Sequence, residues 1–265
     1  MQSRTVAPKK APAQQRAKPK PRAQKPAKPK AAVPKQKPKA PQPRVKAKPR
    51  RPTQNQRAYA RAWRRDGISV VAYARSARVG VYARPHAKRP RLRLPRRDEN
   101  GTPMSFLVRS RRRGWLRVYL PTRPNGSMGW IRREAVKLYD DRFLVVISVR
   151  RHELKLWDGH EVAARYPVAV GTSSTPTPRG LFYIVELLQP SNPGGTYGPF
   201  SFGLSAHSSV LRHFAGSDGR VGLHGTNQPA LIGSSVSHGC IRVHNESIRR
   251  LARILPLGTP VFIRT

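Results

Sequence analysis

Three features are scarce in this 265-residue sequence: cysteine, acidic side chains and long apolar runs. A single cysteine, Cys240, excludes a disulfide within the chain, so cysteine pairing gives no information on the redox compartment. No apolar run reaches the roughly 18 residues that a membrane-spanning helix needs, so the sequence predicts no such helix. Residues 1–15 carry positive charge but lack the apolar stretch of a secretory signal.

The shortage of acidic residues makes the chain strongly basic. It has 53 Lys and Arg against 12 Asp and Glu, a net charge of +41, and its first acidic residue is Asp66. Residues 1–60 are rich in Lys, Pro and Ala, and such a segment cannot bury enough apolar surface to offset the entropy of ordering. We therefore expect a disordered, extended basic arm there.

A flexible basic arm binds polyanions mainly by releasing counterions, whatever the polymer is. The expected partners are an anionic cell-wall polymer or an anionic membrane surface. Nucleic acid is a further, non-specific candidate. The alternative interpretation is a solvated linker with no dedicated partner.

From about residue 67 the composition changes to short apolar alternations broken by Gly, Pro and Asn. Several short strands at close spacing predict a small antiparallel β-barrel over residues 67–138. Residues 114–136, "GWLRVYLPTRPNGSMGWIRREAV", resemble a bacterial Src-homology-three-like barrel. We expect Trp115 and Trp130 to be core aromatics rather than a ligand platform, because large aromatic side chains mainly serve burial.

A second block begins near Arg142 and is also mainly β. "RFLVVISV", "HELKLW" and "LFYIVELL" are strand-like, and Asp158-Gly159 is suited to a tight hairpin turn. The one prominent helix is "NESIRRLARILPLG", where Ser247 is the predicted N-cap. Its apolar stripe has helical spacing, made by Ile248, Leu251, Ala252 and Leu255.

Cys240 lies in "VSHGCIRVHN", close to His224, His238 and His244. Three interpretations are open from the residues alone: a buried structural cysteine, a zinc ligand, or a nucleophile paired with histidine. The polar surroundings argue against the first, and a lone thiol argues against the second. An imidazolium, Arg242 and a following helix would each favour the thiolate, which is the attacking form.

Longer stretches around these residues carry a family resemblance. "LHGTNQPALIGSSVSHGCIRVHNESI" (223–248), "TPTPRG" (175–180), "YGPF" (197–200) and "GTPVFI" (258–263) closely resemble the L,D-transpeptidase (YkuD-type) catalytic domain. The combination of H-G-T with S-H-G-C-x-R is highly specific. The resemblance implies a catalytic domain at 142–265 with a β-sandwich fold.

The resemblance also implies roles for single residues. Cys240 matches the nucleophile and His224 the general base, with the carbonyl of Gly225 orienting the ring. His238 and Gly239, with the Cys240 amide, match the segment that shapes the oxyanion hole.

Further positions match the supporting residues of the family site. Ser237 matches a serine that supports the site through hydrogen bonds. Arg242, Tyr197 and Thr226 are expected to bind substrate. The resemblance implies neither a metal nor an organic cofactor.

The implied function is peptidoglycan L,D-transpeptidation. The cysteine takes the acyl group of a tetrapeptide stem as a thioester and passes it to the amine of a neighbouring stem. The alternatives are an L,D-carboxypeptidase with the same site and a non-enzymatic polyanion-binding protein. We expect a monomer that works in the cell envelope. We expect the lack of a recognisable secretory signal to reflect a misassigned start codon or an unrecognised export route.

Overall fold

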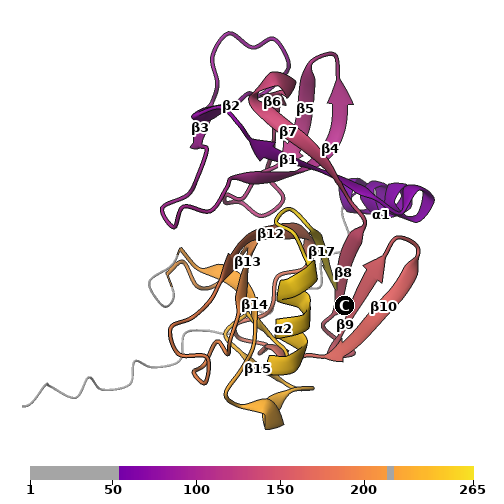
Figure 1. Cartoon of the computed structure of the whole chain (residues 1–265), viewed down its shortest axis with the longest axis vertical. Coiled ribbons are helices and arrows are strands. Elements are labelled where there is room, and N and C mark those ends of the chain that lie inside the picture. The colour runs from indigo at the N-terminus through magenta and orange to yellow at the C-terminus, as the bar shows by residue number, and fades with distance from the viewer. Residues whose placement is uncertain (1–53, 214–217) are drawn as a thin grey trace, which may run out of the picture. The chain divides into compact units, whose positions relative to one another are not determined.

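The computed structural model describes residues 54–213 and 218–265, which all fall in one compact unit of the chain (Figure 1). Most of the predicted basic arm, residues 1–53, lies outside the described part. The expected end of that arm, near residue 60, falls inside helix α1, Gln54–Asp66. Tyr59 and Trp63, one helical turn apart, are buried there, while the arginines of the helix that flank them are exposed.

An N-terminal sheet follows α1, and we use this name for residues 69–141. Its strands are β1 (Ser69–Ala74), β2 (Arg78–Val81), β3 (Leu92–Pro95), β4 (Ser105–Arg112), β5 (Trp115–Tyr119), β6 (Met128–Arg132) and β7 (Val136–Asp141). A 3-10 turn, η1 (Arg133–Ala135), precedes β7. Five strands pair antiparallel in the order β6-β5-β4-β1-β7, and β2 pairs with β3.

Apolar burial explains why these short segments form strands. Val79 and Val81 in β2 and Leu116 and Val118 in β5 enter one apolar cluster, and Arg117, between the two β5 residues, is only partly buried. A bridge between Tyr82 and the β6 residue Trp130 adds β2 to the edge of the sheet. The Src-homology-three-like identity of this region stays a prediction.

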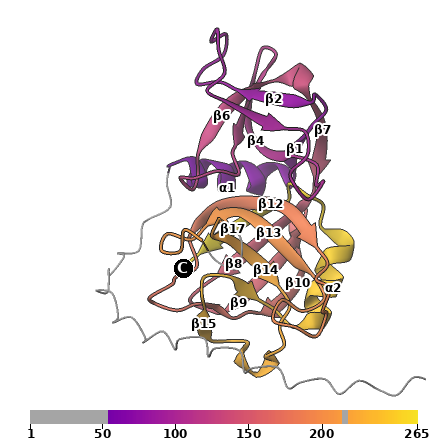
Figure 2. The ribbon, with the colours of Figure 1, turned by 90° about the vertical axis from the view of Figure 1, so that its left-hand side faces the viewer.

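The C-terminal region is built on one mixed sheet in the order β10-β9-β8-β17-β12-β13-β14-β16 (Figure 2). These strands are β8 (Phe143–Ser148), β9 (Glu153–Asp158), β10 (Glu161–Pro167), β12 (Gly180–Leu188), β13 (Ser201–His207), β14 (Arg220–His224), β16 (Ile241–Arg242) and β17 (Pro260–Arg264). A small parallel pair joins β11 (Val170–Gly171) to β15 (Ser235–Ser237). A second 3-10 turn, η2, covers Pro229–Leu231.

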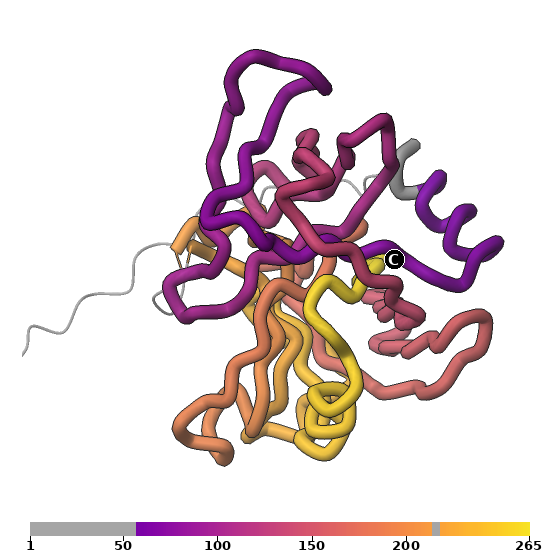
Figure 3. The backbone as a smooth tube through the Cα atoms, turned by 45° about the horizontal axis from the view of Figure 1, so that its top comes forward, coloured from indigo at the N-terminus to yellow at the C-terminus, as the bar shows by residue number. Residues whose placement is uncertain are grey.

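The last strand, β17, lies between segments that are far apart in the sequence (Figure 3). It pairs parallel with β8 and antiparallel with β12, so it closes the middle of the sheet. The Asp158-Gly159 turn joins β9 to β10 as predicted, with Gly159 at a φ of 57°. The expected mainly β fold is confirmed.

Helix α2 spans Asn245–Ile254 and is the helix that the sequence predicted. Ile248 and Leu251 are fully buried in the large apolar cluster of the C-terminal sheet, with Leu255 just after the helix. The expected cap was wrong: the N-cap position is His244, which makes no side-chain capping bond, and Ser247 is a buried residue of the first turn. No helix in the described part of the chain is long and apolar enough to cross a membrane.

A third apolar cluster includes residues of α1 and of both sheets. Trp63, Leu107 and Tyr183 are among its buried members, and the Tyr183 hydroxyl donates to the Tyr119 carbonyl at 3.2 Å. The Arg123 guanidinium donates to the Ser208 carbonyl at 2.8 Å. These contacts connect the two sheets within the same compact unit.

Leu204 lies in the middle of β13, the strand that pairs with β14, and has 0% exposure. The substitution Leu204→Ala should therefore leave a cavity beneath β13. We expect the free energy of unfolding to fall by about 2–5 kcal/mol. Val210→Ala is the matched control, because Val210 is 53% exposed and its truncation should change stability by less than about 0.5 kcal/mol. Urea denaturation followed by circular dichroism measures both, and equal midpoints would contradict the burial of Leu204.

Candidate active site

Cys240 is held in the turn between β15 and β16 and is partly exposed. Gly239, directly before it, has a φ of 118°, a conformation that side chains disfavour. The Sγ atom of Cys240 accepts a hydrogen bond from the Gly222 amide of β14 at 3.4 Å. The turn therefore presents the thiol to the neighbouring strand β14 rather than to the apolar core.

Ser237 holds this turn from within. Its side chain is buried, and its Oγ donates to the Cys240 carbonyl at 2.6 Å and accepts from the Gly239 amide at 3.1 Å. The Ser237 carbonyl accepts from the Thr172 amide at 3.0 Å and from the Thr175 hydroxyl at 3.1 Å. One serine thus connects the cysteine turn with the proline-containing loop at 172–180.

His224 is the last residue of β14 and is only 2% exposed. Its Nδ1 lies 2.6 Å from the Gly225 carbonyl oxygen. Because a carbonyl can only accept, Nδ1 carries the proton in the neutral ring and Nε2 keeps a free lone pair. This is the orientation that the sequence resemblance implied for Gly225.

Gly222 connects the imidazole with the thiol. Residues 222 and 224 lie on the same face of β14, and a Cβ built on Gly222 would come within 3.4 Å of the His224 Cδ2. The Gly222 amide is also the donor to Sγ. The Cδ2 atom of the His224 ring therefore lies beside Gly222, the residue whose amide contacts the Cys240 sulfur.

Burial dominates the electrostatics of the pair. It lowers the pKa of His224 from its usual 6.5 to about 4, with a smaller lowering from Arg242 and an opposing effect of the Gly225 hydrogen bond. Burial also raises the pKa of the Cys240 thiol above its usual value, against smaller lowering effects of the Gly222 amide and Arg242. Both shifts favour a neutral thiol and a neutral imidazole over a thiolate paired with an imidazolium.

Tyr197 packs edge-on against His224, with the ring centroids 4.8 Å apart. The proximity of Cys240 contributes to raising the pKa of the Tyr197 hydroxyl, after burial. Tyr197 therefore lies beside the His224 and Cys240 side chains. Its loop, 189–200, is thereby fixed against the end of β14.

Close backbone packing holds the loop of Tyr197 near His224. Gly198 and Gly225 approach so closely that a Cβ on either would collide with the other residue and with Asn245. Asn245 accepts a hydrogen bond from the Thr226 amide at 2.8 Å. Thr226 itself is 2% exposed, and its Oγ1 accepts from the Gln228 amide at 3.0 Å, so it contributes to the loop.

Arg242 and His238 differ in position. Arg242 faces His224 across the parallel β14–β16 pair, is half-buried and donates to Gln228 at 3.2 Å. His238 is exposed on the turn before Cys240.

Among residues 54–213 and 218–265, no three His, Cys, Asp or Glu side chains are grouped in a way that could hold a metal ion.

Two residues of this site were not found from the sequence. Gly222 supplies the amide that contacts sulfur, and its only sequence signal is a glycine inside the strand "RVGLH", which indicates a close approach. Asn245 supplies the contact that fixes Thr226, and its signal is its position at the start of α2.

Ser237→Ala removes both hydrogen bonds of the buried hydroxyl and leaves the Gly239 amide without this acceptor. We expect stability to fall by about 1–3 kcal/mol and the rate of Cys240 alkylation by iodoacetamide to change, because the turn loses its internal support. Ser173→Ala is the control, since Ser173 is exposed on the adjacent loop. Unchanged stability and alkylation in Ser237→Ala would show that the hydroxyl does not hold the turn.

Comparison with known proteins gives a consistent picture. Residues 142–263 match the family model of the L,D-transpeptidase catalytic domain, YkuD. The "Putative L,D-transpeptidase YkuD" of Bacillus licheniformis is 41% identical over 46% of this chain and 65% of its own length. The protein of the same name in Bacillus subtilis is 40% identical over 47% of this chain and 68% of its length.

Among solved structures, an L,D-transpeptidase from Mycobacterium smegmatis aligns with 75% of this chain and 99% of its own, at 17% identity and a TM-score of 0.40. The chain spans about two thirds of the length of the curated relatives. The identity to the Bacillus subtilis relative and the matching catalytic-domain model together establish that the chain belongs to the L,D-transpeptidase (YkuD) family.

Proposed function

We propose that the chain is a peptidoglycan L,D-transpeptidase in which Cys240 is the nucleophile and His224 the general base. The observation that carries the proposal is the position of Gly222, which contacts Sγ through its amide and lies beside the His224 ring. Membership of the family supports the reaction type and the peptide stem as substrate. Work in the cell envelope follows from that substrate.

The first half-reaction forms the acyl-enzyme. His224 Nε2 takes the thiol proton as Sγ attacks the donor carbonyl, and the S–C bond forms while the carbonyl oxygen becomes an oxyanion. Collapse of this intermediate breaks the C–N bond, and the imidazolium returns its proton to the leaving amine of D-alanine. The product is a thioester on Cys240.

The second half-reaction transfers the acyl group. The acceptor amine loses a proton to His224 as its nitrogen attacks the thioester carbonyl, and the C–S bond then breaks. The sulfur leaves as thiolate and recovers the proton from the imidazolium. If water takes the place of the amine, the same steps give the carboxypeptidase reaction.

The backbone of the cysteine turn is suited to the oxyanion. The Gly239 amide already donates to Ser237, so we assign the oxyanion to the Cys240 amide rather than to Gly239. Gly239 then acts through its left-handed conformation, which shapes the turn. We assign His238, which is exposed beside Gly239, to contact with the peptide rather than to proton transfer.

Arg242 and Tyr197 complete the proposed substrate contacts. Arg242 is a half-buried cation beside the reactive pair, suited to a carboxylate of the peptide stem. Tyr197 offers a ring edge against His224 and restricts the entry of water to the acyl-enzyme. Thr226, fully buried and bonded within its loop, is assigned a supporting role rather than direct contact with substrate.

Acylation by a carbapenem, an inhibitor class associated with the family, tests the nucleophile. Intact-mass spectrometry should find one acyl adduct on the wild-type chain and none on Cys240→Ser. His224→Gln should acylate about 10²–10⁴-fold more slowly, because the base is lost while the nucleophile remains. Equal labelling of the wild type and Cys240→Ser would refute the proposal.

A tetrapeptide donor with and without an acceptor amine identifies the reaction. A cross-linked product in the presence of the amine supports transpeptidation. Release of D-alanine with no transfer to the amine would instead identify a carboxypeptidase. Cys240→Ser is the negative control for the reactions with and without the acceptor amine.

The pH dependence of acylation tests the neutral pair. His224 can accept a proton only when its ring is unprotonated, which holds above its lowered pKa of about 4. The acylation rate should therefore fall on the acid side at about pH 4 rather than near the usual histidine value of 6.5. Rates measured from pH 3.5 to 8, with circular dichroism to confirm folding, give the profile, and an acid limb near 6.5 would contradict it.

A further inference from the structure

A separate cavity lies in the N-terminal sheet, and no residue of the proposed active site lines it. Its volume is about 410 Å³, and its lining includes His86, Lys88, Trp115, Arg132 and Glu134. The residues come from the loop after β2, the start of β5 and the end of β6 with η1. Neither the resemblance nor the proposed transpeptidation gives this cavity a role.

The aromatic rings of the cavity hold a guanidinium in place. Arg132 Cζ lies 5.2 Å from the Trp115 ring centroid and 6.0 Å from that of Tyr82. Tyr82 meets Trp115 edge-on at 5.0 Å, and His86 does so at 5.7 Å. Because Trp115 is only 5% exposed, its ring supports the cation rather than presenting a free stacking surface.

The charge around the cavity is almost entirely positive. Residues 69–141 contain 18 Lys and Arg against 5 Asp and Glu, an excess of 13 positive charges. In the described part of the chain, Arg132 is the only one of these 18 cations with an ion pair, a 3.5 Å contact to Glu134 between two exposed side chains. Such a contact contributes little, so the guanidinium stays available to an anion.

The backbone at the cavity is also unusual. His86 has a φ of 62°, although it is not glycine, and this conformation turns the loop so that its ring meets Trp115. Strained positions of this kind persist where surrounding contacts hold them, and they are frequent at binding sites. His86 and Lys88 line the same cavity as Arg132.

We propose that this cavity binds one phosphate group of a linear, base-free polymer of repeating phosphate groups, and that the surrounding arginines follow the polymer away from the cavity. Lys88 and Arg132 supply the donors, and His86 lines the same wall. Uncompensated cations along a surface gain affinity for a polyanion through counterion release. The inference does not depend on the proposed transpeptidation.

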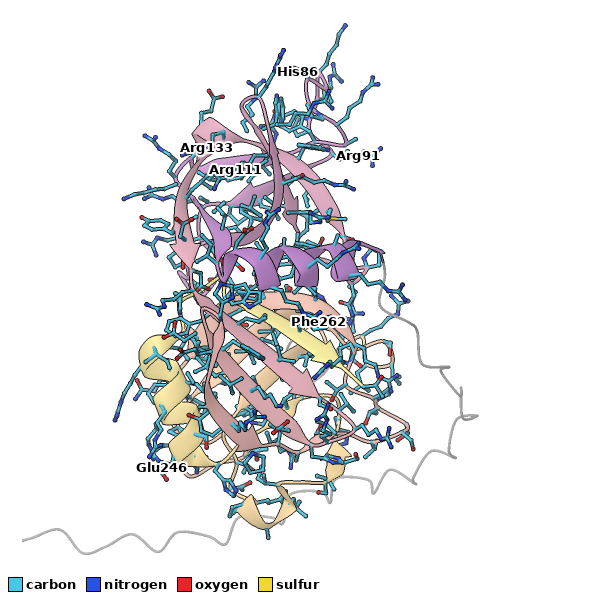
Figure 4. All side chains as sticks on the ribbon, turned by 90° about the vertical axis from the view of Figure 1, so that its right-hand side faces the viewer. His86, Arg91, Arg111, Arg133, Glu246 and Phe262 are labelled. Atoms are coloured by element: carbon cyan, nitrogen blue, oxygen red, sulfur yellow. The ribbon has the colours of Figure 1, made fainter. Side chains whose placement is uncertain are left out.

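Three observations favour such a polymer over other anions. Trp115 is too buried to stack on bases. Apart from the three-residue η1, residues 69–141 form no helix that could enter a DNA groove. In Figure 4, Arg91 and Arg133 lie at opposite edges of the N-terminal sheet, so the cations do not face a single plane as a membrane surface requires.

The test uses the full chain and long-chain inorganic polyphosphate as the base-free probe. The double variant Lys88→Gln/Arg132→Gln should lose about tenfold in affinity at physiological salt, and its slope of log K against log salt should fall by about two. Glu134→Gln should bind severalfold more tightly, because a repelling carboxylate is removed. The matched control is Arg249→Gln/Arg253→Gln, which loses the same charge from the exposed face of α2.

Hydrogen exchange measured by mass spectrometry separates this cavity from the basic arm. Polyphosphate should slow exchange at residues 82–91, 112–116 and 131–134. Protection confined to residues 1–53, or equal losses in the cavity variant and the control, would overturn the proposal. Tighter binding to oligothymidylate of equal phosphate number, or to phosphatidylglycerol vesicles, would overturn the choice of polymer.

Carbapenem acylation of Cys240 is followed in every variant. It should be unchanged in Lys88→Gln/Arg132→Gln, because both substitutions lie outside the residues around Cys240. Loss of polymer binding with normal acylation supports the cavity proposal. A failure of acylation in the wild type would refute the transpeptidase proposal without affecting the polymer-binding result.

Discussion

The parallel pairing of β14 with β16 is the constraint on which the proposed chemistry depends. It sets Leu223 opposite Ile241 and His224 opposite Arg242. Gly222 and Cys240, which directly precede the paired residues of β14 and β16, therefore also come into contact. Parallel strands need a long crossover between them, and here residues 225–240 supply it. That crossover contains Thr226, Ser237 and Gly239. Because it separates the two paired strands in the sequence, the H-G-T and S-H-G-C-x-R motifs lie far apart along the chain although the site itself is small.

Burial gives the pair its character. The Cys240 thiol and the His224 imidazole both lose solvation on folding, which favours a neutral thiol and a neutral imidazole over the ion pair. The contact of Nδ1 with the Gly225 carbonyl fixes the tautomer of His224. The Ser237 hydroxyl fixes the turn that contains Cys240. In the proposed reaction, charge therefore develops only as the substrate is attacked, where preorganised amides and Arg242 can stabilise it.

Sequence periodicity recovered the strands that alternate or run apolar, such as those at 143–148 and 181–188, and the helix after Cys240. It did not recover β13 and β14, because "SFGLSAH" and "RVGLH" are rich in small and polar residues. These strands are stabilised by pairing with both neighbours and by the packing of Phe202 and Leu223, which local propensity does not report. Helix α1 was missed because its arginines continue the basic composition before it.

The sequence by itself determined which residues are proposed to carry the chemistry: one cysteine and the H-G-T and S-H-G-C-x-R motifs. It also determined the uneven distribution of positive charge. Residue type and spacing are local properties, so they can be read without a fold. Only the tertiary structure decided the contact of Gly222 with sulfur, the lowered pKa of His224 and the cavity beside Trp115. Each of these depends on burial or on strand pairing between distant segments, and neither quantity is set by neighbours along the chain.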